Sequence, residues 1–343
     1  MHPQLSPVLD DLLAARTVSA ASIQSAMIAI MDGNCQPAET AALLTALAIR
    51  GETPEMLAGA ARAMREKASV IPTRREGLLD TCGTGGDKLH TFNISTASAL
   101  VAAAAGVPVA KHGNRGVSSS SGSCDVLEAL GVRVDLTPEQ VGRCIDEIGI
   151  GFCFARVVHT AMKHVAPIRA ELGFRTIFNL LGPLTNPARA AFQVIGTSRI
   201  ATAERLAEAI RQLGTRRTLV VCGNDELDEV SLWGTTTVFD VQNDEVRTQH
   251  WTAGDLGLEQ CRVDQLRVDS PPASAEIITS IFNGSAPAPQ RNMVLANAGA
   301  ALLAAGRVST IGDGVRLAAE TIDSGAAKGK LTELVKATRG APK

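Results

Sequence analysis

Hydrophobic positions recur at helical spacing through the first 70 residues of the chain, and no run in this part is typical of a strand. One predicted helix carries its apolar face on Ile23, Met27 and Ile30. Two more begin at Pro37 and Pro54, since proline is favoured in the first turn of a helix. This part predicts a small, all-helical N-terminal domain.

From about residue 77 the pattern changes to short apolar runs that alternate with helical stretches. The runs that predict strands are Leu78–Cys82, Val107–Lys111, Val132–Asp135, Gly151–Ala155, Phe192–Thr197 and Thr218–Cys222. Helices are predicted between most of them, including Pro138–Ile148 and Ala203–Gln212. Such alternation is typical of a mostly parallel sheet covered by helices.

The C-terminal third of the chain differs again. Alternating residues from Val230 to Trp251 predict an antiparallel ribbon that turns at Asn243–Asp244. After Ser274 the pattern is helical. The predicted fold class is therefore α/β, with a small all-helical N-terminal domain and a larger domain that has a mostly parallel central sheet flanked by helices.

Composition narrows the class of protein. The 343 residues exceed the size of a typical single core, so two domains are expected. A net charge of −2 argues against a general binder of nucleic acids or anionic membranes, and we expect neither a signal peptide nor a membrane-spanning run. Seven cysteines without a Cys-x-x-Cys pair indicate reduced thiols. We expect a cytoplasmic, ligand-binding protein with no nucleic-acid partner and no membrane association.

Two glycine-rich loops are the strongest candidates for a binding site. The loops Gly83–Asp87 and Lys111–Ser119 each follow a predicted strand and lead toward a predicted helix. A glycine loop before a helix N-terminus directs backbone N–H groups and the helix dipole toward an anion. Because the second loop also contains Lys111 and Arg115, the pair indicates a ligand with more than one phosphate.

Each loop also has a plainer interpretation. Gly83–Asp87 matches neither a Walker A loop nor the dinucleotide fingerprint, so a tight turn explains it nearly as well. The hydroxyls and amides of Asn93–Thr96 suit a phosphate and a metal ion, but Asn or Ser there is also a common helix cap. The density of polar groups in Lys111–Ser119 favours anion binding, whereas His112 alone is more often a structural histidine.

An acidic cluster follows the predicted strand Thr218–Cys222. Its carboxylates are Asp225, Glu226, Asp228 and Glu229. Beside a phosphate site such a cluster predicts Mg²⁺ binding, and without one it would be a solvated acidic turn. The two phosphate loops favour the metal.

Basic residues mark another polar segment. The stretch His159–Arg169 is predicted as one helix. Arg169 and Arg175 are candidates for bidentate binding of a carboxylate, although each alone is more often a surface charge. The segment Asn179–Pro187 is rich in turn residues and predicts either a hinge between domains or a rigid loop.

Together these segments resemble the anthranilate phosphoribosyltransferase family, whose members join anthranilate to phosphoribosyl pyrophosphate in tryptophan biosynthesis. The resemblance covers nearly the whole chain. It rests on the helical N-terminus and on Gly83–Asp87, Asn93–Thr96, Lys111–Arg115, Ser123–Leu130, His159–Lys163, Arg175–Pro187 and Leu227–Glu229. It implies a magnesium-dependent glycosyltransferase.

The resemblance also implies the residues of the site. Phosphoribosyl pyrophosphate would be bound by Gly83, Gly86, Asp87, Thr91, Asn93, Ile94, Ser95, Thr96, Lys111, His112, Gly113, Asn114, Arg115, Gly116, Val117, Ser118, Ser119 and Ser123. Anthranilate would be bound by Gly83, His112, Asn114, His159 and Arg169. Mg²⁺, about two ions per subunit, would be held by Ser95, Asp228 and Glu229, which leaves out Asp225 and Glu226. The expected catalytic residues are Lys111, Arg115 and Asp87.

The implied architecture has a small domain of residues 1–72, on which helices near 167–189 pack, and an α/β domain of residues 73–166 and 190–343. Family members usually pair as homodimers through the small domains, so a homodimer is expected here.

Three positions depart from the family pattern. Gly116, Ser120 and Cys124 stand where members often have Ser or Ala, Lys, and Ala. Ser120 removes one positive charge near the phosphate loop, and Lys88 is a candidate to restore it.

Two other functions remain open. A pyrimidine nucleoside phosphorylase shares this architecture but would carry out phosphorolysis and need a base-recognising pocket. The segments Lys111–Arg115 and Asn179–Pro187 favour the transferase over it. A non-catalytic nucleic-acid binder of this fold should be basic and should lack the metal-binding acids, whereas this chain has the acids and is not basic.

Overall fold

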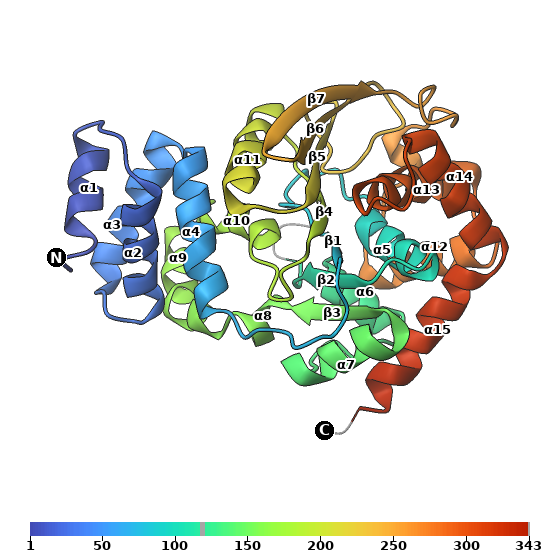
Figure 1. Cartoon of the computed structure of the whole chain (residues 1–343), viewed down its shortest axis with the longest axis horizontal. Coiled ribbons are helices and arrows are strands. Elements are labelled where there is room, and N and C mark those ends of the chain that lie inside the picture. The colour runs from blue at the N-terminus through green and yellow to red at the C-terminus, as the bar shows by residue number, and fades with distance from the viewer. Residues whose placement is uncertain (117–120, 342–343) are drawn as a thin grey trace.

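The computed structural model describes residues 1–116 and 121–341. A group of N-terminal helices lies at one end of the molecule, and the rest of the chain surrounds a central sheet (Figure 1). This arrangement confirms the predicted fold class.

The N-terminal part consists of α1 (Ser6–Leu13), α2 (Ala20–Met31), α3 (Pro37–Arg50) and α4 (Pro54–Lys67). As predicted, α3 and α4 begin with proline, and the Thr53 hydroxyl caps α4 by accepting a hydrogen bond from the Met56 N–H at 3.3 Å. α2 and α4 pack closely at Gly59, where an added Cβ would lie 2.2 Å from the Ala20 carbonyl oxygen. Small residues therefore allow this close contact between the helices.

The central sheet has the strand order β3-β2-β1-β4-β5-β6-β7 within the described residues. The strands are β1 (Leu79–Thr81), β2 (Val109–Gly113), β3 (Ile150–Phe154), β4 (Phe192–Gly196), β5 (Arg217–Gly223), β6 (Thr236–Gln242) and β7 (Glu245–Trp251). β1 to β5 are parallel, whereas β6 and β7 are antiparallel. Asn243 and Asp244, with φ of 53° and 62°, form the predicted two-residue turn between β6 and β7.

Helices cover both faces of the sheet (Figure 1). One face packs on α5 (Ile94–Ala104), α6 (Ser123–Ala129), α12 (Pro271–Phe282), α13 (Ala288–Ala304), α14 (Ile311–Asp323) and α15 (Ala326–Arg339). The other packs on α7 (Pro138–Ile148), α11 (Ile200–Leu213) and the N-terminal helices. Along β5, Leu219 and Val221 face the first core and Val220 and Cys222 face the second. No helix in the described part of the chain is long and apolar enough to cross a lipid bilayer.

Between residues 155 and 187 the chain returns to the N-terminal helices. This segment contains α8 (Ala155–Val158), η1 (Thr160–His164), α9 (Ala166–Leu172), α10 (Phe178–Leu181) and η2 (Gly182–Leu184). Val165 and Phe178 join the same apolar core as α2, α3 and α4. The prediction of a single helix over His159–Arg169 is wrong, because His159 has φ −112° and ψ 60° and a new helix begins at Ala166, with Pro167 in its first turn.

The strand predicted at Val132–Asp135 is also wrong, since the described sheet does not include it. Val132 and Val134 are buried and alternate with more exposed residues, as the pattern suggested. The segment lies against α15 instead, and the Arg133 N–H donates to Thr338 Oγ1 at 3.2 Å. Alternating burial therefore identified an extended segment but could not identify its neighbour.

Candidate active site

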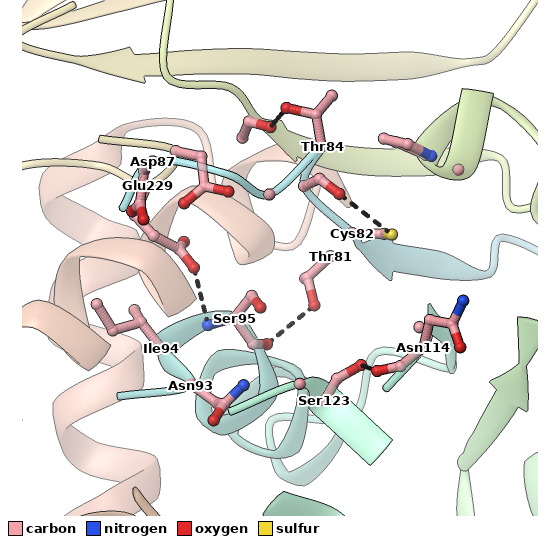
Figure 2. A pocket seen from close by; sticks show the side chains of 18 of the residues that line it. Thr81, Cys82, Thr84, Asp87, Asn93, Ile94, Ser95, Asn114, Ser123 and Glu229 are labelled. Atoms are coloured by element: carbon pink, nitrogen blue, oxygen red, sulfur yellow. Dashed lines mark hydrogen bonds between the residues drawn. The ribbon is translucent and has the colours of Figure 1, made fainter. Parts of the chain in front are cut away.

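A cavity of about 300 Å³ lies at the carboxyl ends of β1 and β2 (Figure 2). β1 has β2 on one side and β4 on the other, so the cavity lies where the order of the parallel strands reverses. Its wall is built from the loop after β1, the N-terminus of α5, the end of β2, the start of α6, residues 179–183 and the loop that contains Asp228 and Glu229. Both predicted glycine loops therefore meet at one place.

Most of the predicted site residues line this cavity: Gly83, Gly86, Asp87, Thr91, Asn93, Ile94, Ser95, Lys111, His112, Gly113, Asn114, Ser123, Asp228 and Glu229. The predicted residues that are not in the described wall are Thr96, Arg115, Gly116, His159 and Arg169. Val117, Ser118 and Ser119 lie outside the described residues, as does Ser120.

Two glycines of the loop after β1 lie close to neighbouring groups. At Gly86, which has φ +87°, an added Cβ would lie 1.9 Å from Nη1 of Arg175. At Gly83, an added Cβ would lie 3.1 Å from the Gly196 carbonyl oxygen. The N–H of Thr84 donates to the same oxygen at 2.8 Å and fixes the loop there. The backbone itself, and not side chains at these two positions, therefore forms this part of the wall.

α5 begins at the cavity without a side-chain cap. Asn93 precedes the helix, but its Nδ2 donates to the Ser121 carbonyl oxygen at 3.1 Å, and its Oδ1 accepts from the hydroxyls of Ser121 and Ser274. The Ser95 N–H donates to Glu229 Oε1 at 3.1 Å (Figure 2). The helix-cap interpretation of Asn93 is therefore wrong. The dipole of α5 favours an anion at this end of the cavity.

Lys111 is the cation that the second loop contributes to the cavity wall. The residue is 4% exposed, and Nζ donates to the Thr81 carbonyl oxygen at 2.8 Å. Two residues on, an added Cβ at Gly113 would lie 2.1 Å from Ser123 Oγ. That hydroxyl donates to the Asn114 carbonyl oxygen at 3.3 Å (Figure 2). The end of β2 and the start of α6 are therefore closely packed at the cavity.

Arg115 does not reach the cavity wall. Its Nη1 lies 3.0 Å from a carboxylate oxygen of Asp125 and 2.7 Å from one of Glu128, and its Nη2 donates to Glu128 at 2.8 Å. Two acids of α6 therefore balance this guanidinium before any ligand binds. Gly116 is bound to one of the same acids, because its N–H donates to Asp125 Oδ2 at 2.9 Å. Thr96 lies in the first turn of α5 and is buried.

Asp87, Asp228 and Glu229 form an acidic side of the cavity. Figure 2 shows Asp87 and Glu229 side by side there. Burial raises the pKa of Asp228, and the Asp87 carboxylate raises it further. Burial and Asp228 together raise the pKa of Glu229. These carboxylates repel one another, which is the electrostatic setting that a divalent cation relieves. Asp225 and Glu226 lie outside this group, because they accept hydrogen bonds from the N-terminus of α11 and from an indole N–H.

The acidic side fits Mg²⁺ in its type of ligand, which is the carboxylate oxygen. Within the described residues, the only His, Cys, Asp and Glu atoms that come within 4.8 Å of one another as a group of three belong to Asp80, Cys82 and His112. Mg²⁺ suits the acidic side, since it commonly binds one or two carboxylates and completes its coordination with water and substrate phosphates.

His112 and His159 form a buried pair beside the cavity, with ring centroids 5.1 Å apart in an edge-to-face arrangement. Nδ1 of His112 lies 3.0 Å from the Gly182 carbonyl oxygen. A carbonyl only accepts, so this nitrogen carries the proton. Burial lowers the pKa of His112 to about 4 and the pKa of His159 to about 3. Both rings are therefore neutral near pH 7.

Arg169 is held by Asn179, which forms part of the cavity wall. Nη2 of Arg169 donates to Asn179 Oδ1 at 3.2 Å, and the guanidinium lies 5.5 Å from the centre of the Phe178 ring. Burial and the Arg175 cation lower the pKa of Arg169. The sequence predicted Asn179 only as the start of a hinge or rigid loop. Its hydrogen bond to Arg169 could not be predicted, because it depends on the break between α9 and α10.

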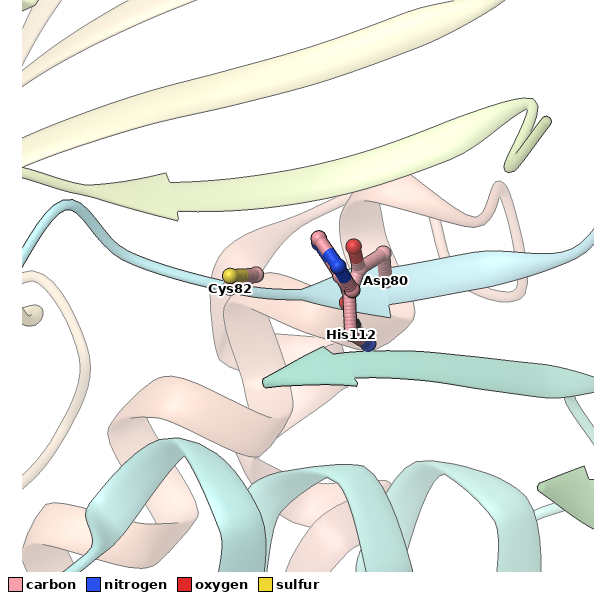
Figure 3. A group of neighbouring side chains, drawn as sticks. All are labelled: Asp80, Cys82 and His112. Atoms are coloured by element: carbon pink, nitrogen blue, oxygen red, sulfur yellow. Dashed lines mark hydrogen bonds between the residues drawn. The ribbon is translucent and has the colours of Figure 1, made fainter. Parts of the chain in front are cut away.

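Asp80 is a buried residue next to the cavity wall that the sequence patterns did not single out (Figure 3). Oδ1 of Asp80 accepts from the His112 N–H at 3.0 Å, and Oδ2 accepts from Asn186 Nδ2 at 2.8 Å. The side chains of Asp80, Cys82 and His112 offer ligand types that suit zinc. Both Asp80 oxygens are occupied, however, and the Lys111 cation acts on the same carboxylate, so we favour a structural role. The sequence signal that could have identified Asp80 is an acidic residue inside an apolar predicted strand.

The chain matches two family models that together span most of its length. One, described as the helical bundle domain of a glycosyl transferase family, matches residues 6–68. The other, described as the a/b domain of a glycosyl transferase family, matches residues 75–328. Among curated proteins, the anthranilate phosphoribosyltransferase of Symbiobacterium thermophilum is 49% identical over 324 residues, which cover 94% of this chain and 95% of the relative.

Solved structures show the same similarity. The anthranilate phosphoribosyltransferase of Thermus thermophilus superposes with a TM-score of 0.92 at 43% identity, over 97% of this chain and 99% of the other. The Saccharomyces cerevisiae anthranilate phosphoribosyltransferase, in complex with PRPP and Mg, superposes with a TM-score of 0.91 at 26% identity, over 99% of each chain.

Proposed function

We propose that this chain, which belongs to the glycosyl transferase family of those two domains, transfers the phosphoribosyl group of 5-phosphoribosyl 1-pyrophosphate (PRPP) to the amine of anthranilate. The products are N-(5-phosphoribosyl)anthranilate and pyrophosphate, and the reaction is a step of tryptophan biosynthesis. Relatives and solved structures that match nearly the whole chain are anthranilate phosphoribosyltransferases. They favour this function over a nucleoside phosphorylase and over a nucleic-acid binder.

One observation of the structure carries the proposal. Both glycine loops, the N-terminus of α5, Lys111 and an acidic side converge on a single cavity. PRPP bears a 5-phosphate and a pyrophosphate, so it requires two anion-binding regions together with a metal ion to offset its charge. A site for a singly charged ligand would not need this combination.

PRPP would lie along the loop after β1, the start of α5 and the end of β2. Support for these contacts comes from the shared cavity wall, whose predicted PRPP residues are Gly83, Gly86, Asp87, Thr91, Asn93, Ile94, Ser95, Lys111, His112, Gly113, Asn114 and Ser123. Contacts from Thr96, Arg115 and Gly116 stay predictions, because these residues are not in the described cavity wall. Contacts from Val117, Ser118 and Ser119 also stay predictions.

Ser95, Asp228 and Glu229 would hold Mg²⁺, with about two ions per subunit. The raised pKa values of both acids support a cation there, because a nearby positive charge would favour their ionised forms. When bound, Mg²⁺ supplies positive charge beside the pyrophosphate. The chain contributes the positions of the ligands, since the Ser95 N–H holds Glu229 and the Gly85 N–H bonds to Asp228.

The chemistry depends on charge that develops as pyrophosphate leaves. The ribose becomes an oxocarbenium-like centre, and negative charge accumulates on the leaving group. Lys111 and the N-terminus of α5 are placed to stabilise that charge. The aromatic amine is already a neutral nucleophile at pH 7, so the reaction needs orientation more than a strong base. We therefore expect no covalent ribosyl-enzyme intermediate, and isolation of such an adduct would contradict the mechanism.

Anthranilate would bind between Gly83, Asn114 and Arg169, with His112 and His159 beside its path. The charge of Arg169 supports this assignment, because its hydrogen bond goes to a neutral amide and no carboxylate of the described residues pairs with it. An unpaired, half-buried guanidinium is suited to the carboxylate of the acceptor. The neutral histidines would contribute shape and hydrogen bonding, not charge.

We propose the same two-domain division that the resemblance implies: residues 1–72 with helices near 167–189, and residues 73–166 with 190–343. Support comes from the apolar core that α10 shares with the N-terminal helices. Homodimer formation is supported by Leu13 and Ile49, which are 74% and 79% exposed on α1 and α3. A cytoplasmic location is supported by the seven free cysteines. Ile49→Asp should give a monomer in analytical ultracentrifugation, and an unchanged dimer would count against this interface.

The reaction is tested by following anthranilate fluorescence with purified protein, PRPP and Mg²⁺. We expect a decay that requires all three components, together with release of pyrophosphate. A flat trace from folded protein would contradict the proposal. Phosphorolysis of a pyrimidine nucleoside, or a salt-dependent shift of DNA or RNA in a gel, would then support one of the other two functions.

A further inference from the structure

The side-chain amide of Asn179 has a fixed orientation. Its oxygen accepts hydrogen bonds from the Thr176 N–H at 2.9 Å and from Arg169 Nη2 at 3.2 Å. A backbone N–H and a guanidinium only donate, so the atom that faces them must be the oxygen and not the nitrogen. The opposite end of the amide is therefore Nδ2, which carries two hydrogens to donate.

Asn179, which carries this donor, is a residue of the cavity wall. Asn179 is half-buried and forms part of the cavity wall, whereas Arg169 does not. Nδ2 of Asn179 has no hydrogen-bond partner among the described residues, and it is not one of the fully buried polar atoms that lack a partner. It is therefore an accessible donor that a ligand in the cavity can satisfy.

The charges around Asn179 favour an anionic group. Arg169 lies directly behind it, and Arg175 is near enough to lower the pKa of Arg169. The acids of the cavity come from other elements, the loop after β1 and the loop after β5. The group that best accepts hydrogen bonds from the two N–H donors of Nδ2, with a guanidinium nearby, is a carboxylate.

We propose that Asn179 is a specificity-determining residue that donates from Nδ2 to the carboxylate of the acceptor substrate and holds Arg169 in position for the same carboxylate. This inference rests on the proposed function, since it names the group that recognises the acid of anthranilate. It explains how an ortho-carboxylate would be selected over a neutral substituent: the carboxylate only accepts, and Nδ2 of Asn179 and the guanidinium of Arg169 only donate.

The variant that tests this role is Asn179→Asp. The new carboxylate has nearly the same shape and still accepts from the Thr176 N–H and from Arg169, so α10 keeps its hydrogen bonds. It removes the Nδ2 donors and places a negative charge where the substrate's charge would lie. Asn179→Ser is a second variant that shortens the side chain without adding charge. Asn243→Asp, in the turn between β6 and β7, is the control for an Asn-to-Asp change far from the cavity.

Binding of anthranilate and of 2-aminobenzamide is measured by fluorescence titration in the presence of Mg²⁺ and pyrophosphate. For Asn179→Asp we expect anthranilate to bind on the order of 100-fold more weakly, while the neutral amide binds equally well or better. Asn179→Ser should lower the preference for the acid to a smaller degree, and the Kd of PRPP should stay unchanged in both. Equal loss of both aminobenzoyl ligands would show a structural role and overturn the inference, as would unchanged binding of anthranilate.

Turnover by the unmodified protein separates this inference from the proposed function. If the unmodified protein does not consume anthranilate with PRPP and Mg²⁺, the proposed function fails. If it does, and Asn179→Asp keeps the preference for acid over amide, only the role of Asn179 fails.

Discussion

Asn186 donates a hydrogen bond from Nδ2 to Oδ2 of Asp80 over 2.8 Å, although 106 residues separate the two along the chain. The same nitrogen donates to the Ala110 carbonyl oxygen at 2.7 Å, and Asp80 Oδ1 accepts from the His112 N–H at 3.0 Å. One buried carboxylate therefore joins β1, β2 and the segment after η2. These are the strands whose ends carry the two glycine loops.

Asp80→Asn should lower the free energy of unfolding by about 1–3 kcal/mol at pH 7. The amide nitrogen would have to face a donor on one side, either the His112 N–H or Asn186 Nδ2, and one hydrogen bond would be replaced by a repulsive contact. Urea unfolding measures the change. Asp10→Asn, at an exposed position of α1, is the matched control and should stay within about 0.5 kcal/mol. Equal stability of both variants would remove Asp80 from its structural role.

The pH dependence of stability should contain a contribution from Asp80. Burial raises its pKa from 3.8 to about 6, against the opposing effect of Lys111. Because the folded-state pKa is the higher one, the folded protein binds this proton more tightly, and stability rises as the pH falls through 6. Between pH 7 and pH 5 the unmodified protein should gain about 1 kcal/mol that Asp80→Asn does not gain. Parallel pH profiles for the two proteins would contradict this.

Local patterns predicted the helices and most strands because each depends on residues close together in the sequence. Pro37 and Pro54 mark helix starts, and the alternation after Val230 marks the antiparallel ribbon. The same patterns failed at Val132–Asp135, where burial alternates but the neighbour is a helix. The spacing of hydrophobic residues shows which side of a segment is buried, but it does not show which element packs against that side.

The site was predictable where its residues share a contiguous loop and unpredictable where they meet across the fold. Glycine loops and acidic clusters are visible as motifs, and both reach the cavity. Arg115 looked available for phosphate, but its ion pairs with Asp125 and Glu128 depend on how α6 folds back beside it. The role of Asp80 was hidden for a similar reason, since a single acid in an apolar strand has no meaning until Asn186 lies beside it.

Arg169→Ala should weaken anthranilate binding roughly 10- to 100-fold, because it removes an unpaired cation from the side of the cavity where the carboxylate would bind. The KM for PRPP should change little. Steady-state fluorescence assays give both constants. Lys163→Ala removes an exposed charge from the neighbouring turn and serves as the control. An equal rise in both KM values would assign Arg169 to the structure of the segment and not to anthranilate.

Asp228→Asn combined with Glu229→Gln should suppress activity by a factor of about 100 or more and shift the Mg²⁺ dependence to higher concentrations. Both carboxylates face the cavity beside Asp87, so their removal takes away the hard anionic ligands. Removal of Mg²⁺ with EDTA should have the same effect on the unmodified protein. Asp225→Asn is the control from the same loop, since that side chain binds the N-terminus of α11. An unchanged Mg²⁺ curve in the double variant would exclude both residues from the metal site.

Gly86→Ala and Gly85→Ala separate two reasons for glycine in the loop after β1. Both residues have positive φ, +87° for Gly86 and +63° for Gly85, so both substitutions should cost about 1–2 kcal/mol of backbone strain. Only at Gly86 would the added Cβ meet a neighbour, because it would displace Nη1 of the exposed Arg175 side chain from the loop, whereas nothing lies within 4 Å of a Cβ at Gly85. We therefore expect Gly86→Ala to weaken PRPP binding clearly more than Gly85→Ala does, as measured by isothermal titration with Mg²⁺ present. Similar losses in the two variants would mean that backbone conformation alone, and not the close approach of Arg175, requires glycine at this position.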